Sequence, residues 1–167
     1  MVALGLAGTE LGYPPEPFEP WFDRARAAGL HSVPHAGETA GPESIWGALR
    51  TLGAERLGHG VRAIEDPSLM DYLVERRIPL EVCPTSSVAL GVYPSLAEHP
   101  LPRLVSAGAL VTINTDTPAI FGTTLTAEVE LLRTAFGLSD VASQQVVQNA
   151  VEASFRSPAE RAALDTE

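Results

Sequence analysis

The chain has 167 residues, of which 45% are hydrophobic and 19% charged, so it can bury the core of one domain and is neither a disordered tail nor a coiled coil. Arginine supplies all 11 basic residues against 21 aspartates and glutamates, and the formal net charge is −10. This acidic balance argues against nucleic acid and against an anionic membrane surface as partners.

Cysteine content and hydropathy exclude further classes. Cys83 is the single cysteine, which excludes an internal disulfide framework and a zinc site built only from cysteine. No apolar run approaches the length of about 18 residues that a membrane span needs, and no basic segment precedes the N-terminal apolar run. We therefore expect neither a membrane helix nor a signal peptide, and a cytoplasmic protein.

Short apolar runs alternate with amphipathic stretches along the whole chain. In chain order the predicted elements are a strand over Val2–Ala7, a helix over Phe18–Ala28, a strand over His31–Ala36, a helix over Gly41–Leu52, a strand over Arg56–Gly60, a helix over Pro67–Arg77, a strand over Pro79–Cys83, a helix over His99–Ala107, a strand over Leu110–Asn114, helices over Leu125–Phe136 and Val141–Ala153, and a short helix from Ser157-Pro158. Ser139 or Asp140 is expected to cap the helix over Val141–Ala153. The runs do not alternate in polarity, as expected of strands covered on both faces.

This order of elements predicts an α/β fold with parallel strands. Five strands fit either a small doubly wound sheet or part of a barrel, because a complete eight-stranded α/β barrel typically needs about 250 residues. No linker divides the chain, so we expect one domain.

Unusual polar residues follow the predicted strands. Gly8 and Glu10 end the first strand, His35 and Glu38 the second, and His59, between two glycines, the third. The fifth strand ends in Asn-Thr-Asp-Thr-Pro, which contains Asp116. Because parallel strands end at one common face, these side chains are expected to converge there.

Plainer interpretations stand beside this one. His35 could be satisfied by a neighbouring carbonyl, Glu38 could cap the next helix, and Asp116 could be an ordinary turn residue. Cys83 is expected to be a small buried hydrophobe, and His31 and His99 to be structural or solvated.

The converging set suits metal-assisted hydrolysis. Imidazole nitrogen and carboxylate oxygen are zinc ligands, a second histidine could take a proton from water, and another carboxylate could protonate a substrate. Ser86 and Ser87 lack a nucleophile-elbow context, and no phosphate-binding glycine motif is present. His35 and Asp116 supply only two ligands, however, whereas catalytic zinc usually has three protein ligands.

The ordered set of strand-end motifs resembles the adenosine deaminase family of the amidohydrolase superfamily. The motifs are LAGTE (6–10), HAGE (35–38), RLGHG (56–60), EVCPTSS (81–87) and NTDTP (114–118), followed by IFGTTL (120–125), and they span almost the whole chain. The family fold is an eight-stranded (β/α)8 TIM-type barrel. The resemblance covers its C-terminal five strands, so residues 1–167 are expected to be a single partial domain.

The resemblance implies zinc-dependent hydrolytic deamination, in which activated water attacks C6 of an adenine ring and ammonia leaves. It assigns His35 and Asp116 as zinc ligands, with Asp116 also close to the reacting water. Glu38 would protonate the purine ring at N1, and His59 would orient and deprotonate the water. Gly8 would contact the purine through its backbone.

Two departures from the family pattern bear on function. The chain has no His-x-His pair, so two zinc ligands would lie on strands outside it, and we expect a fragment that is inactive and self-associates through exposed barrel edges. Thr117 stands where adenosine deaminases usually carry a second aspartate that bonds purine N7. A related substrate such as aminofutalosine, a non-catalytic deaminase-like binding protein, and a stand-alone half-barrel dimer are the alternatives.

Overall fold

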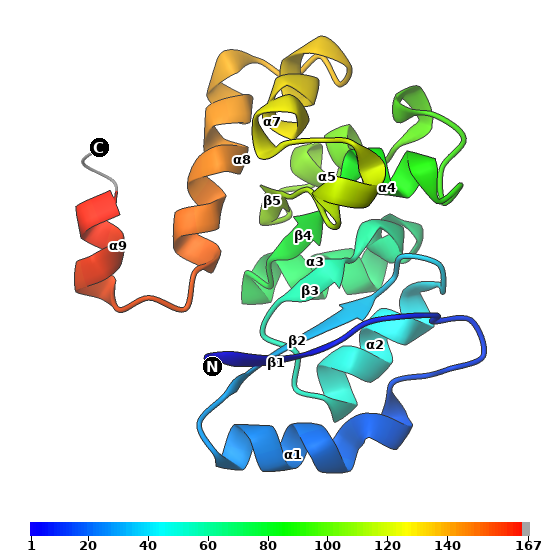
Figure 1. The fold of residues 1–167 in the computed structure, drawn as a ribbon, viewed down its shortest axis with the longest axis vertical. Helices are drawn as coiled ribbons and strands as arrows, with labels where there is room; N and C mark the ends of the chain where they lie inside the picture. The colour runs from blue at the N-terminus through cyan, green and yellow to red at the C-terminus, as the bar shows by residue number, and fades with distance from the viewer. Residues whose placement is uncertain (165–167) are drawn as a thin grey trace.

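The computed structural model describes residues 1–164, in which five parallel strands form a sheet. The strands are β1 (Ala3–Leu6), β2 (His31–Ala36), β3 (Leu57–His59), β4 (Leu80–Val82) and β5 (Val111–Ile113). They lie side by side in chain order (Figure 1). A doubly wound sheet reverses its strand order at a switch point, and this sheet does not, so its order is that of a barrel segment.

Helices follow the strands close to the predicted bounds. The longer ones are α1 (Glu19–Ala27), α2 (Pro42–Thr51), α3 (Pro67–Arg76), α5 (Leu101–Ser106), α7 (Leu125–Thr134), α8 (Asp140–Ala153) and α9 (Pro158–Leu164). The hydroxyl of Ser139 accepts the N–H of Ala142 at 3.2 Å, so Ser139 rather than Asp140 caps α8. Five short elements were not predicted: η1 (Glu16–Phe18), η2 (Val61–Glu65), α4 (Pro84–Ala89), η3 (Leu96–Glu98) and α6 (Pro118–Phe121).

The core lies between the sheet and the helices that cover its outer face. Its fully buried side chains include Ile45 and Leu52 from α2 and its C-terminus, Leu69 and Leu73 from α3, and Leu80 and Val111 from the sheet. Apolar burial of this extent is the main favourable contribution to the folded state.

The inner face of the sheet is covered unevenly. Every residue of β3 and β5 is buried, as expected of strands covered on both faces. That expectation is wrong for β1, in which no residue is buried, and for β2, where Ser32, Pro34 and Ala36 are buried but the three alternate residues are half-buried. Side chains alternate between the two faces of a strand, so one face of β2 packs under helices while the other, which carries His35, stays accessible.

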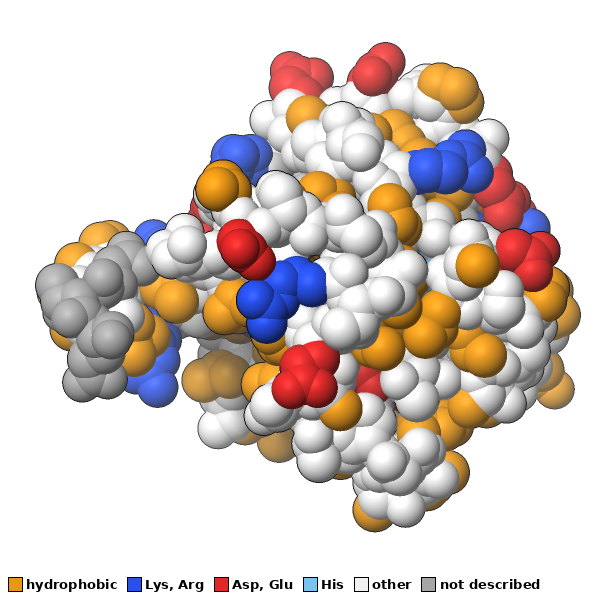
Figure 2. Space-filling model, turned by 90° about the horizontal axis from the view of Figure 1, so that it is seen from above, with side chains coloured by type: hydrophobic (Ala, Val, Ile, Leu, Met, Phe, Trp, Pro, Cys, Tyr) orange, Lys and Arg blue, Asp and Glu red, His pale blue; other side chains and the backbone are white. Residues whose placement is uncertain are grey.

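None of the helices in residues 1–164 is long and apolar enough to cross a membrane. On the face shown in Figure 2, basic side chains lie in small separate groups among acidic and hydrophobic ones.

Candidate active site

Three of the predicted site residues converge at the C-terminal edge of the sheet. His35 is the penultimate residue of β2, His59 ends β3 and Asp116 follows β5, and each offers a nitrogen or oxygen atom within 4.8 Å of those of the other two. The two imidazole rings lie 5.0 Å apart at an interplanar angle of 59°. The structure thus brings together side chains that are 81 positions apart between His35 and Asp116.

Glycines in the Gly-His-Gly motif make this approach possible. Gly58 is the register partner of His35, and a Cβ atom on Gly58 would lie 2.8 Å from the His35 ring. Gly60 has a φ of +65°, and a Cβ there would lie 2.6 Å from Leu80. A side chain at position 58 would displace the His35 ring, so Gly58 serves the placement of that histidine, whereas Gly60 is favoured by its left-handed backbone and its contact with Leu80.

The backbone is also left-handed at two of the site residues themselves. His59 has a φ of 61° and Asp116 a φ of 56°. A residue with a side chain pays about 1–2 kcal/mol to adopt this conformation. Such strain concentrates at functional sites, where it aims a side chain that a relaxed backbone would point elsewhere.

The donor atoms of this cluster fit a divalent metal. Among residues 1–164, Nδ1 of His35 and Nδ1 of His59 are buried with no hydrogen-bond partner, although buried polar atoms are ordinarily paired. One carboxylate oxygen of Asp116, Oδ2, accepts a hydrogen bond from the Ser86 hydroxyl at 2.7 Å. Burial, and then the neighbouring His35, lower the pKa of His59 to about 4, so its ring is neutral and keeps a lone pair at pH 7.

Glu38 lies beside the cluster and faces it. Its carboxyl is buried, and Oε1 lies 3.6 Å from Nε2 of His59. Burial, then the charges of Glu10 and Asp116, raise the pKa of Glu38 to about 7. The interpretation of Glu38 as the cap of α2 is wrong: Gly41 stands at the N-cap, and its N–H is accepted by Glu43 at 3.1 Å. Glu38 is instead a carboxyl poised to exchange a proton near neutral pH.

Two cavities meet at His35. One, of about 400 Å³, is lined by His59, Cys83 and Asp116 and holds the cluster. The other, of about 330 Å³, is lined by apolar side chains and by the Gly8 segment after β1. Gly8 is exposed with a φ of +124°, and its Cβ position has no atom within 4 Å, so its backbone borders open space. A flat ring could enter between these surfaces.

Thr117 lies at the mouth of the site. It is exposed at the start of α6, and its hydroxyl donates to Oδ1 of Asp116 at a long 3.4 Å. Its side chain therefore turns toward Asp116 rather than being bound elsewhere in the fold.

The remaining histidines and the cysteine are structural. His99 is buried against the rings of Tyr93 and Phe136, and His31 stacks on Phe155 with ring centroids 3.7 Å apart. Cys83 is buried, and burial raises the pKa of its thiol well above the usual range. The expectations for these residues are confirmed.

The supporting roles of Glu10 and Ser86 at the site were not predicted from the sequence. Glu10 was noted at a strand end without a role, and Ser86 was considered only as a nucleophile, whereas the structure shows Ser86 holding Asp116 and Glu10 holding the Glu38 loop. The available signal for Glu10 was a carboxylate that follows the first predicted strand, next in chain order to the strand that precedes Glu38.

Comparison with known proteins identifies relatives along the entire chain. A sequence model of the adenosine deaminase family matches residues 1–167. The chain is 49% identical over 167 residues to an aminodeoxyfutalosine deaminase of Streptomyces avermitilis, covering 100% of this chain and 47% of that protein. It is 49% identical over 164 residues to an adenosine deaminase of Klebsiella pneumoniae, covering 98% of this chain and 49% of that protein. The chain thus spans about half the length of the curated relatives it matches.

Solved structures also superimpose on nearly the whole of this chain, which again covers about half of each of them. An adenine deaminase from Arthrobacter aurescens superimposes with a TM-score of 0.95 at 38% identity, over 98% of this chain and 50% of that one. An amidohydrolase from Burkholderia ambifaria with bound zinc superimposes with a TM-score of 0.92 at 26% identity, over 99% of this chain and 47% of that one. The five-stranded α/β sheet is therefore the C-terminal part of a barrel of this type.

Proposed function

The chain belongs to the adenosine deaminase family, and from this premise we propose that residues 1–167 are a single partial domain of a zinc-dependent hydrolase that deaminates adenosine or a related adenine nucleoside. The observation that carries the proposal is the convergence of His35, His59 and Asp116, with Glu38 beside them, at one edge of the sheet. Histidines and carboxylates that served only to stabilise the fold would not need to gather at one edge of the sheet.

His35 and Asp116 would hold the metal, since their atoms lie together and imidazole nitrogen and carboxylate oxygen suit zinc. Zinc, when bound, lowers the pKa of water so that it becomes a nucleophile near neutral pH. Catalytic zinc usually has three protein ligands. Because these 167 residues contain no His-x-His pair, the further ligands would come from strands outside them, and activity would require those strands.

His59 and Glu38 would handle the protons. The neutral His59 ring orients the attacking water and accepts its proton, because its pKa of about 4 leaves the ring unprotonated at pH 7. Glu38, with a pKa of about 7, holds a proton that it donates to N1 of the purine ring. Protonation at N1 draws electrons from C6, which favours attack by water there and the departure of the amino group as ammonia.

Thr117 and the curated relatives favour a second candidate substrate. Threonine is shorter than aspartate and uncharged, so its contact with N7 of a purine is weaker than the contact that the family pattern implies. Aminodeoxyfutalosine deaminases of Streptomyces avermitilis and Streptomyces coelicolor are 49% and 52% identical to this chain. An adenine nucleoside of the aminodeoxyfutalosine type is therefore the alternative to adenosine, with Gly8 contacting the purine through its backbone in either case.

The test combines metal analysis with an assay of ammonia release. Zinc content and turnover of adenosine, aminodeoxyfutalosine and free adenine are measured for this 167-residue chain and for any longer product of its gene. Zinc near one equivalent with turnover only in the longer product supports the proposal, and the preferred nucleoside decides between the two substrates. Neither zinc nor turnover in both would instead favour a non-catalytic binding protein.

A further inference from the structure

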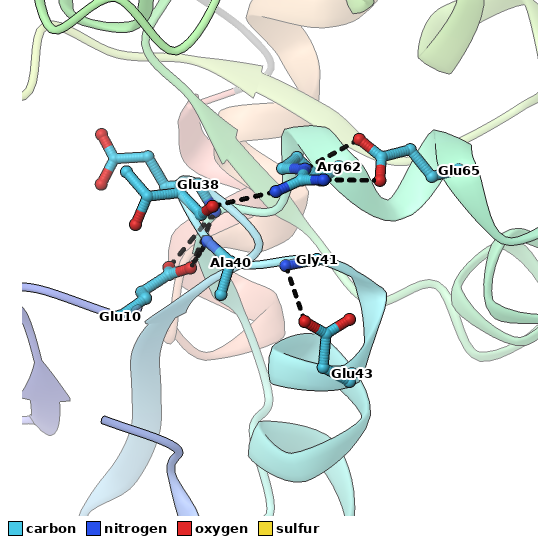
Figure 3. Close-up of polar contacts among 8 residues, drawn as sticks. Glu10, Glu38, Ala40, Gly41, Glu43, Arg62 and Glu65 are labelled. Carbon is cyan, nitrogen blue, oxygen red and sulfur yellow. Dashed lines mark hydrogen bonds and ion pairs between the residues drawn. The ribbon is translucent and has the colours of Figure 1, made fainter. Parts of the chain in front are cut away.

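The loop that carries Glu38 is held from one side by the carboxylate of Glu10. Oε1 and Oε2 of Glu10 lie 3.2 and 3.3 Å from the backbone nitrogen of Glu38, and Oε2 accepts the N–H of Ala40 at 2.8 Å (Figure 3). Glu10 follows β1 and is only 9% exposed. The side chain thus crosses from the end of one strand to the loop after the next.

Arg62, from η2, holds the same loop from the other side. Its Nη1 atom donates to the carbonyl of Thr39 at 2.9 Å. The guanidinium is itself fixed by a two-pronged pair with Glu65, at 2.7 and 2.9 Å (Figure 3). Three consecutive backbone groups, at positions 38, 39 and 40, are therefore bound by side chains of opposite charge from two different elements.

Burying the carboxylate of Glu10 costs free energy unless hydrogen bonds compensate for its lost hydration. No salt bridge joins Glu10 within residues 1–164, so backbone N–H groups alone compensate its buried carboxylate. The start of α2 does not require Glu10, because Glu43 already accepts the Gly41 N–H there. The bonds of Glu10 fall on the loop ahead of the helix, on Glu38 itself.

We propose that Glu10 and Arg62 are positioning residues that hold the Glu38 carboxyl in place beside His59, an inference that rests on the proposed function of Glu38. The charge of Glu10 supports this assignment, since after burial it is the largest influence that raises the pKa of Glu38. Glu10 thereby influences both the position of the Glu38 carboxyl and its pKa, without contacting the cluster of His35, His59 and Asp116.

The direct test is amide hydrogen exchange in the 167-residue chain. Glu10→Gln keeps the size of the side chain but removes its charge and replaces one acceptor oxygen with an NH2 group. With the remaining oxygen at the Oε2 position, where it accepts from Ala40, this NH2 group would lie 3.2 Å from the backbone nitrogen of Glu38, donor against donor. We expect the amides of Glu38 and Ala40 to exchange about tenfold faster or more, since an unsatisfied buried donor is costly. Glu43→Gln is the matched control, with an effect confined to Gly41. Unchanged exchange at Glu38 and Ala40 in folded Glu10→Gln overturns the inference.

Kinetics in the gene product that carries deaminase activity test the positioning role. Glu10→Gln should lower kcat about tenfold or more with KM changed less than about twofold, because a misplaced proton donor affects the transition state. Arg62→Gln should act in the same direction, Arg62→Lys should recover part of the rate, and Glu65→Gln should have the smallest effect. An unchanged kcat in Glu10→Gln overturns the inference. Glu38→Gln at the parental rate overturns the proposed function instead, which separates the two failures.

Discussion

Glu38 and His59 lie 3.6 Å apart, yet their surroundings move their pKa values in opposite directions. Burial disfavours the charged form of each, which raises the pKa of the carboxyl to about 7 and lowers that of the imidazole to about 4. Near pH 6 both groups are therefore largely uncharged, one with a proton to give and the other with a lone pair to accept one. Opposed shifts of this kind are how a site assigns acid and base roles.

Glu38→Gln should lower the rate of deamination by about 10²–10⁴-fold, since the amide cannot donate a carboxylic proton. Zinc content should stay at the parental level, because Glu38 is separate from His35 and Asp116. Ammonia release and metal analysis on the active gene product check both statements. A variant that loses zinc together with activity would show that Glu38 serves the metal rather than the substrate.

His99 makes folding stability depend on pH. Burial lowers its pKa from 6.5 to about 4, so between these values the unfolded chain binds a proton that the folded chain does not. The stabilising effect of the neutral ring is complete above pH 6.5 and is lost as the pH falls toward 4, on the order of 3 kcal/mol in total. Chemical denaturation of the 167-residue chain from pH 7 to pH 4 measures this loss.

His99→Asn provides the comparison, because its side-chain oxygen can still accept the Leu101 N–H that Nδ1 of His99 accepts at 3.2 Å. The variant should be less stable at pH 7 but show a flatter dependence on pH than the parent. His59 titrates in the same range in both proteins, so the difference between the two curves isolates His99. Parallel curves would show that folding does not shift the pKa of His99.

Residue types and spacing were enough to predict that His35, His59 and Asp116 converge, because the ends of parallel strands meet by topology alone. The contacts of Glu10 and Ser86 were not predictable in this way. They depend on how far a side chain reaches across a loop, and that distance is set by the packing of neighbouring strands rather than by any local pattern.

Helices and strands followed their local signals closely. The five strands and the longer helices coincide with apolar runs and amphipathic stretches in the sequence, and the structure confirms them. The helices α4 and α6 are made largely of the residues of the strand-end motifs themselves, which show no apolar period. Short elements at a site are set by tertiary contacts, which is why the sequence alone did not indicate them.

Ser139→Ala should destabilise the chain by about 1 kcal/mol, since the cap of α8 loses its acceptor for the Ala142 N–H. Asp140→Ala should change stability by about 0.5 kcal/mol or less, because its ion pair with Arg133 and its charge in the first turn of α8 are both exposed to solvent. Thermal or urea unfolding of both variants measures the difference. A larger loss in Asp140→Ala would contradict the assignment of Ser139 as the cap.

The whole molecule is an open piece of a barrel. Within residues 1–164 the sheet ends at β1 on one side and at β5 on the other, and unpaired strand edges favour pairing between chains. The partial barrel could be predicted from the resemblance that the ordered motifs carry, whereas the accessible inner face of β2 could not, because its non-alternating apolar run indicates a strand covered on both faces.

The 167-residue chain should self-associate in a concentration-dependent manner, and Val2→Lys should weaken the association. Val2 is 69% exposed immediately before β1, so a lysine there places a repelling charge beside the edge of a second copy. Val141→Lys, on α8 at 79% exposure, adds the same charge away from that edge and should have little effect. Sedimentation velocity over a range of concentrations distinguishes the variants, and equal association in both would exclude the β1 edge as the contact.

The left-handed backbone at His59 and Asp116 implies a conflict between folding and chemistry at these positions. Glycine adopts that conformation without penalty, so a chain under no requirement but to fold would be more stable with glycine at either position. Arg77, at the C-terminus of α3 and outside the site, has the same left-handed backbone, and among the site residues His59 and Asp116 are the two that carry this cost. A molecule that served only as an inert scaffold would have a free-energy reason to discard them, and this one keeps both.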